Sequence, residues 1–302
     1  MGYTDAAHAL VVLALLKLPK HLAIRLDNLQ PSGSAYMFQA TYPPWPSLTA
    51  PPLSALYGVK GLRHLDIIHL RNAKKQPHLH LIAHGESSGI WFHICTRSSI
   101  RSSTRSEFNK LERLVAHLDT QDVTTFRLTI LPEAVECLAF LRPLLMEMPS
   151  LSRVLIKCSS KLTPPLASDL LHRAEDALMP SSSPESSSPD GGAAGIPAPA
   201  LDSLGIQLEC PKAPVDALVR LTASRAQSGH PIRSLECNIS GTTQEDLASV
   251  AEYVDNLDVT SRPLFNEISG NVPAVFKMKN DYWELFCRED GMEGWDLPES
   301  PD

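Results

Sequence analysis

One spacing of apolar residues, apolar-x-x-apolar-x-apolar, recurs along the chain and limits the folds that the chain can adopt. The last two apolar positions of each copy alternate with other residues, as on a β-strand with one buried face. Most copies are followed by a segment with the apolar spacing of a helix. Five copies are present, at Leu62/Leu65/Ile67, Val123/Phe126/Leu128, Leu151/Val154/Ile156, Leu201/Leu204/Ile206 and Ile232/Leu235/Cys237. The pattern predicts an α/β protein made of stacked strand-helix units.

The distance between copies tests this interpretation. The second and third copies start 28 residues apart and the fourth and fifth start 31 apart, close to the ~20 to 29 residues of a leucine-rich repeat. The third and fourth are 50 apart, but removing a Ser- and Pro-rich run of 21 residues at 180–200 restores a spacing of 29. The first and second are 61 apart, so we expect a strand beginning at Ile90 to lie between them. These spacings favour an irregular leucine-rich-repeat-like solenoid with a parallel sheet on its concave face.

A solenoid needs a different element to cover the apolar face of its last unit. The segment from Pro273 to Trp295 is rich in aromatic residues, so we expect it to form a C-terminal cap. The expected layout is a helix, a strand and a Pro-rich loop in 1–60, a first repeat block in 61–179 with a β-hairpin at 78–95, a disordered loop at 180–200, a second repeat block in 201–260, and the cap with an acidic tail in 261–302.

Charge and cysteine content exclude several classes of function. The formal net charge is −7, and residues 281–302 supply all of it, with eight acidic side chains against Arg288. The remaining 26 basic and 26 acidic residues balance, so no basic excess points to nucleic acid. Six cysteines without a C-x-x-C pair fit a reducing compartment, the cytoplasm or nucleus. The apolar run 6–16 is too short to cross a bilayer, so we expect no membrane association.

The stretch from Val215 to Val259 resembles the C-terminal repeats of fungal, especially basidiomycete, F-box-like proteins. The likeness lies in a helix of the L-V-x-L-x-x-S-R type at 218–225, a Q-S-G-H-P turn at 227–231 and a D-L-x-x-V-x-x-Y-V helix beginning at Asp246. It implies a solenoid that recognises another protein. Nothing in residues 1–60 matches an F-box, so the sequence gives no ground for docking to a Skp-type adaptor.

The resemblance also implies a ladder of Asn or Cys side chains three residues after the third apolar position. This chain has Leu131, Ser159, Glu209 and Ser240 there. We therefore expect irregular turns and uneven curvature.

Metal-ligating side chains gather in the expected hairpin. If Ala83 pairs with Ile90, four side chains share one face: His78, His80, His93 and Cys95. Three imidazoles and one thiolate suit a tetrahedral zinc ion, although the same residues are also typical of the solvent-facing side of an amphipathic hairpin. A small metal-binding or regulatory module is therefore the alternative to a binding scaffold.

No pattern of a nucleophile with a base, no phosphate-binding loop and no dinucleotide-binding fingerprint is present, so we expect neither an enzyme nor a cofactor. The residues between the apolar positions of the strands line one exposed strip, which changes from basic to acidic along the chain. Its members are Arg127, Thr129, Lys157, Gln207, Glu236 and Asn238. Solenoids bind extended partners on such strips, so the sequence predicts a non-catalytic protein-protein interaction scaffold, related to the substrate-recognition part of F-box receptors.

Overall fold

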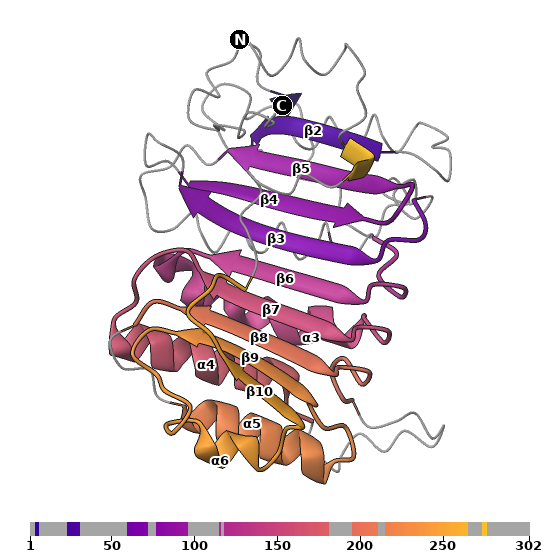
Figure 1. Cartoon of the computed structure of the whole chain (residues 1–302). Coiled ribbons are helices and arrows are strands. Elements are labelled where there is room, and N and C mark those ends of the chain that lie inside the picture. The colour runs from indigo at the N-terminus through magenta and orange to yellow at the C-terminus, as the bar shows by residue number, and fades with distance from the viewer. Residues whose placement is uncertain are drawn as a thin grey trace, which may run out of the picture.

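A computed structural model of the chain describes residues 4–5, 23–30, 59–71, 77–95, 115, 118–180, 195–210, 215–264 and 274–276. Ten strands form one open sheet in the order β1-β2-β5-β4-β3-β6-β7-β8-β9-β10 (Figure 1). The strands are β1 (Thr4–Asp5), β2 (Ala23–Gln30), β3 (His64–Arg71), β4 (Pro77–His84), β5 (Gly89–Cys95), β6 (Thr125–Ile130), β7 (Arg153–Cys158), β8 (Ser203–Leu208), β9 (Ser234–Ile239) and β10 (Asn256–Val259). The helices are η2 (Pro132–Phe140), α3 (Leu141–Met146), α4 (Pro164–Leu178), α5 (Asp216–Gln227), α6 (Ala248–Ala251) and η5 (Ala274–Phe276).

The recurring apolar spacing places the core. Strands β3 and β6 to β10 run parallel, and the second apolar residue of each copy lies beside that of the next, from Leu65 through Phe126, Val154 and Leu204 to Leu235. All fifteen side chains of the five copies are at most 2% exposed. The sequence therefore predicted both the buried face of these strands and their register, and the α/β class is confirmed.

Backbone hydrogen bonds join the units where their strands begin. The carbonyl of Arg63, just before β3, accepts hydrogen bonds from the amides of Thr124 and Thr125, at 2.9 and 3.1 Å. The same pattern of two amides on one carbonyl recurs at the carbonyls of Thr124, Ser152 and Asp202. These regular bonds lie before the strands, whereas the expected irregular turns follow the strands, so that expectation stays a prediction.

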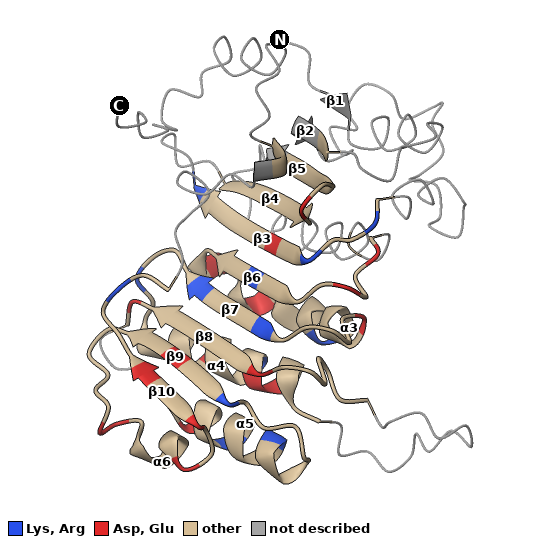
Figure 2. Cartoon of the chain, turned by 45° about the vertical axis from the view of Figure 1, so that its right-hand side comes forward, with Lys and Arg blue, Asp and Glu red and all other residues tan. Residues whose placement is uncertain are grey.

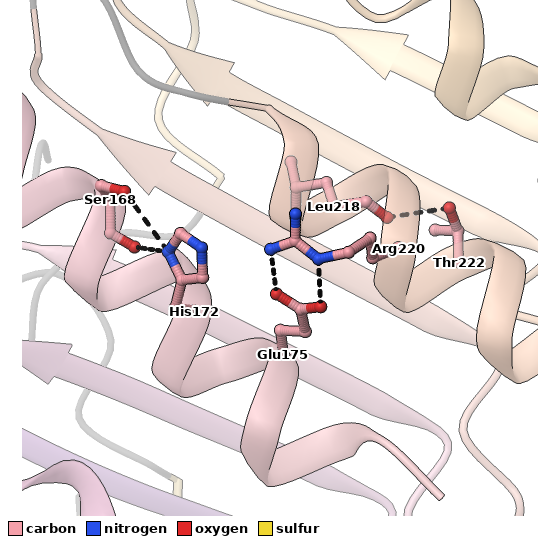
Figure 3. A network of polar contacts seen from close by, with 6 residues as sticks. All are labelled: Ser168, His172, Glu175, Leu218, Arg220 and Thr222. Carbon is pink, nitrogen blue, oxygen red and sulfur yellow. Dashed lines mark hydrogen bonds and ion pairs between the residues drawn. The ribbon is translucent and has the colours of Figure 1, made fainter.

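The helices of the parallel part cover one face of the sheet (Figure 1). Helices α4 and α5 are joined by Arg220, which donates two hydrogen bonds to the Glu175 carboxylate, at 2.7 and 2.6 Å (Figure 3). Between β6 and β7 the chain forms a 3-10 helix until Phe140 and an α-helix only afterwards.

A capping box of Thr243 and Asp246 starts the turn before α6. The side chain and amide of Thr243 both donate to the Asp246 carboxylate, at 2.8 and 2.7 Å. This pair satisfies an amide that the start of a helical segment leaves without a partner.

The β-hairpin has the predicted pairing, with Ala83 opposite Ile90. Its place in the sheet is not the predicted one, because β3 pairs directly with β6 and β5 lies two strands away on the other side. Strand β4 runs antiparallel to both of its neighbours, β3 and β5, so the sheet is mixed and not parallel throughout. At the turn of the hairpin, a Cβ on Gly85 would lie 2.0 Å from the Gly61 carbonyl oxygen, so this close approach requires glycine.

Two expected segments differ from the structure. Residues 195–200, part of the expected disordered loop, belong to the fold, and the Ala198 side chain is fully buried. Residues 275–276 of the expected cap do not cover the last strand. They lie against Gly89 and Trp91 of β5, at the opposite end of the sheet from β10 (Figure 1).

The predicted helix near the N-terminus and the acidic tail lie outside the described residues. Among the described helices, none is long and apolar enough to cross a bilayer.

Candidate binding surface on the open face of the sheet

Helices η2 and α3 to α6 lie on one face of the sheet, and we call the opposite face the open face. Among the described helices, η5 alone lies on the open face. Side chains alternate between the two faces along each strand. Because Phe126 and Leu128 of β6 lie in the core, Arg127 and Thr129 lie on the open face. The register places the six strip residues in two adjacent rows, one with Arg127 and Glu236 and the other with Thr129, Lys157, Gln207 and Asn238. The parallel strands thus bring the predicted strip together on one surface.

The charge of the side chains changes sign across this surface, and ion pairs connect side chains of different strands. Basic residues lie on β6 and β7 and acidic ones on β9 and β10 (Figure 2). Arg153 of β7 reaches over β8 to Glu236 of β9, with 2.7 Å between Nη2 and Oε1. Arg127 lies 3.8 Å from the buried Asp66 carboxylate of β3. Both pairs cross between strands, so the charges are held in fixed positions.

At Gly205, in the middle of the surface, the missing side chain leaves room for two leucine side chains. A Cβ built on Gly205 of β8 would lie 2.3 Å from Cδ2 of Leu155 and 3.3 Å from Cδ1 of Leu264. The Leu155 side chain therefore leans from β7 over the glycine, and Leu264 packs on the same spot. Leu155 is only 2% exposed, although it points to the open face.

The chain after β10 occupies part of the surface. The Asn238 side-chain amide donates to the Arg262 carbonyl at 2.7 Å, and the Leu264 amide donates to Oε1 of Gln207 at 3.0 Å. Both strip residues thus bind backbone groups of the protein itself, in the way that side chains hold an extended peptide.

Histidines dominate the other end of the open face. The His93 ring stacks on those of His80 and His78, with ring centroids 4.4 and 5.0 Å apart. Nδ1 of His78 lies 2.7 Å from Nε2 of His93, and the Trp91 indole donates to Nδ1 of His80 at 3.2 Å. A second stacked pair, His64 and His84, has centroids 4.7 Å apart.

This end of the surface is buried. The interpretation of the hairpin as amphipathic, which predicts that these histidines face solvent, is therefore wrong. His80 and His93 are 2% and 3% exposed. Ile68, Ile82 and Trp91 lie between the histidines and form a second small apolar cluster, to which Phe276 adds its ring. The signal that reveals this in the sequence is the presence of large apolar residues on both faces of the same strands.

The predicted zinc ligands are only partly assembled. His78 faces Cys95 and His80 faces His93, as predicted, but the side chain of Cys95 lies outside the described part. Parallel stacking of the rings does not direct three nitrogen lone pairs to one point. Across the described segments, no group of three or more His, Cys, Asp or Glu side chains is placed to hold a metal ion.

Burial shifts the ionisation of several groups beneath this surface. Burial lowers the pKa of His69, His78 and His84 to about 4, so these imidazoles are neutral at pH 7. Burial raises the pKa of Asp66 to about 6, against the opposing effect of Arg127. Burial also raises the pKa of the Cys237 thiol to about 12, so this core thiol is not a nucleophile at neutral pH.

The open face thus binds backbone groups of this chain through the side-chain amides of Gln207 and Asn238, and it packs the Leu264 side chain over Gly205. No family model, no curated protein and no solved structure matches this chain.

Proposed function

We propose that this chain is a non-catalytic scaffold of leucine-rich-repeat type that recognises another protein through the open face of β6 to β9. The observation that carries the proposal is the placement of all six strip residues in two neighbouring rows on the face of the sheet opposite α3 to α5. The strand-helix units, which share one register and one pattern of backbone bonds, support an irregular solenoid.

The charges of the surface define the partner that it fits. Arg127 at one side attracts acidic side chains, and Asp258 with Glu236 at the other attract basic ones. Lys157 belongs to the same strip but is only 9% exposed, and not exposed as the sequence predicts. An extended segment of a partner protein, acidic at one end and basic at the other, would run across the strands and match this order. The resemblance of residues 215–259 to F-box-like proteins supports a role akin to their substrate-recognition part.

The test removes charge without changing the length of the side chains. Arg127→Met with Lys157→Met keeps the unbranched stems and removes two positive charges from the basic side of the surface, where Arg153 remains. We expect capture of partner proteins by the tagged full chain to fall about tenfold, which corresponds to roughly 1.4 kcal/mol.

The matched control is Arg173→Met, which removes a charge from α4 on the helix-covered side, where Arg173 pairs with Asp169 at 3.1 Å. Capture by this variant should equal that by the wild type. Equal capture by the open-face variant and the wild type would overturn the proposal.

A further inference from the structure

We propose that the segment after β10 is an intramolecular ligand of the open face, a strap that a protein partner must displace. This inference rests on the proposed function, because the partner that displaces the strap is the protein that the open face is proposed to bind. The docking of the strap itself can be tested without any partner. Two groups of contacts hold the strap, one near each end of the sheet.

The first anchor lies on β8 and β9. Leu264 donates its amide to the Gln207 side chain at 3.0 Å, and Arg262 offers its carbonyl to the Asn238 amide at 2.7 Å. The Leu264 side chain packs over Gly205, where Leu155 also lies. This part of the strap is thus held by polar bonds to its backbone and by one apolar side chain, and two of the six strip residues make those bonds.

The second anchor lies on β5. Phe276 packs edge-on against Trp91, with ring centroids 5.5 Å apart. A Cβ on Gly89 would lie 2.7 Å from Cζ of Phe276 and 3.1 Å from Cγ1 of Val275, so the absence of a side chain at Gly89 makes room for η5. Val275 is only 8% exposed. This anchor closes the apolar cluster of Ile68 and Ile82 against solvent.

The length of the chain between the anchors matches the width of the face. Strands β8 and β5 are five strand spacings apart in the sheet order, roughly 24 Å at about 4.8 Å each. Eleven Cα-to-Cα steps separate Leu264 from Val275, and they span at most about 36 to 40 Å. The chain is therefore long enough to connect the two anchors.

A tethered strap competes strongly with any free ligand. A segment linked to its site by a short connection acts at an effective concentration of about 1 mM. A partner that uses Gln207 and Asn238 must displace the strap, so binding is weak until the anchors are released.

The test uses a fluorescent peptide of residues 260–278 as the probe and the full chain as the receptor. In the variant Leu264→Asp with Phe276→Ala, the strap loses its apolar contacts, and we expect the peptide to bind at least about tenfold more tightly than to the wild type. Adding Gln207→Ala and Asn238→Ala should abolish this gain. Equal binding of the peptide to wild type and strap variant, or no binding to the folded strap variant, would overturn the inference.

A second measurement does not depend on the strap variant being folded. In the wild-type chain, hydrogen exchange at the Leu264 amide should be slowed relative to the single variant Gln207→Ala, and unchanged exchange would contradict docking. If the proposed function fails, no partner is captured in any variant while the peptide result stands. If only the inference fails, capture of partner is the same with and without the strap anchors.

Discussion

A single buried arginine connects three parts of the chain. Arg225, in the last turn of α5, is fully buried, and burial lowers its pKa to about 10, which leaves it charged at neutral pH. Its guanidinium donates to the carbonyls of Leu178, Pro197 and Ala198 at 3.0 Å and to that of His230 at 3.2 Å. The end of α4 and the end of the low-complexity segment are thereby held on α5.

Replacing this residue by methionine should cost about 3 kcal/mol or more of unfolding free energy. Arg225→Met keeps the stem but leaves four buried carbonyls without their donor, and each such loss is unfavourable. Urea unfolding of the variant and the wild type measures the difference.

The control for Arg225→Met is Arg233→Met, because Arg233 is 67% exposed and its ion pair with Asp202 spans 3.5 Å. An exposed pair contributes under about 1 kcal/mol. A loss at Arg225 no larger than at Arg233 would show that the carbonyls find other partners.

At the scale of elements, the low-complexity segment is an insertion between α4 and β8 whose two ends are close together. The carbonyl oxygens of Leu178 and Pro197 accept from the same nitrogen, each at 3.0 Å, so they are at most 6.0 Å apart. The connection that the fold needs here is therefore short.

Shortening the insertion should leave the fold intact. Replacement of residues 181–194 by about four Gly and Ser residues should change the unfolding free energy by less than about 1 kcal/mol, because the cost of closing a loop varies slowly with its length. Thermal and urea unfolding of the shortened chain measure this. Loss of the cooperative transition would mean that the insertion itself is part of the core.

At the scale of the whole molecule, the sheet extends in both directions from β3. Parallel strand-helix units extend it towards β10, and the antiparallel hairpin with β2 and β1 extends it the other way. The two halves differ in what lies on the open face, with charged and amide side chains on the first and stacked histidines on the second. This difference makes the second half sensitive to acid.

Stability should fall as the pH falls from about 6.5 to about 4. The pKa of three imidazoles, those of His69, His78 and His84, is about 4 in the folded protein and 6.5 in the unfolded chain. The unfolded chain thus takes up three more protons in this window. Asp66, with a folded pKa of about 6 and an unfolded value of 3.8, takes up one more in the folded state. The net uptake favours unfolding.

The midpoint of urea unfolding at pH 7 and at pH 4.5 tests this prediction. His69→Leu removes one of the three buried imidazoles and should reduce the fall in midpoint between the two pH values. A midpoint that does not fall, or a fall of the same size in the variant, would contradict the assignment to the histidines.

Sequence periodicity by itself determined which residues form the core of each unit. The apolar positions of the five copies, the register of the strands that bear them and the pairing of the hairpin follow from local spacing, because alternation along a strand fixes which side is buried. The same reasoning placed the six strip residues on one face.

Only the tertiary structure decided which strands are neighbours and what covers the open face. Local spacing predicts an apolar strand at Ile90, between the first two copies in sequence. It does not say that β3 pairs with β6 and not with this strand, since that choice depends on contacts between distant segments. The docking of Leu264 and Phe276 depends on the gaps at Gly205 and Gly89, which exist only when side chains from separate strands surround each glycine. Sequence periodicity predicts the buried face of one strand or helix at a time, whereas the open face is formed by side chains from several strands.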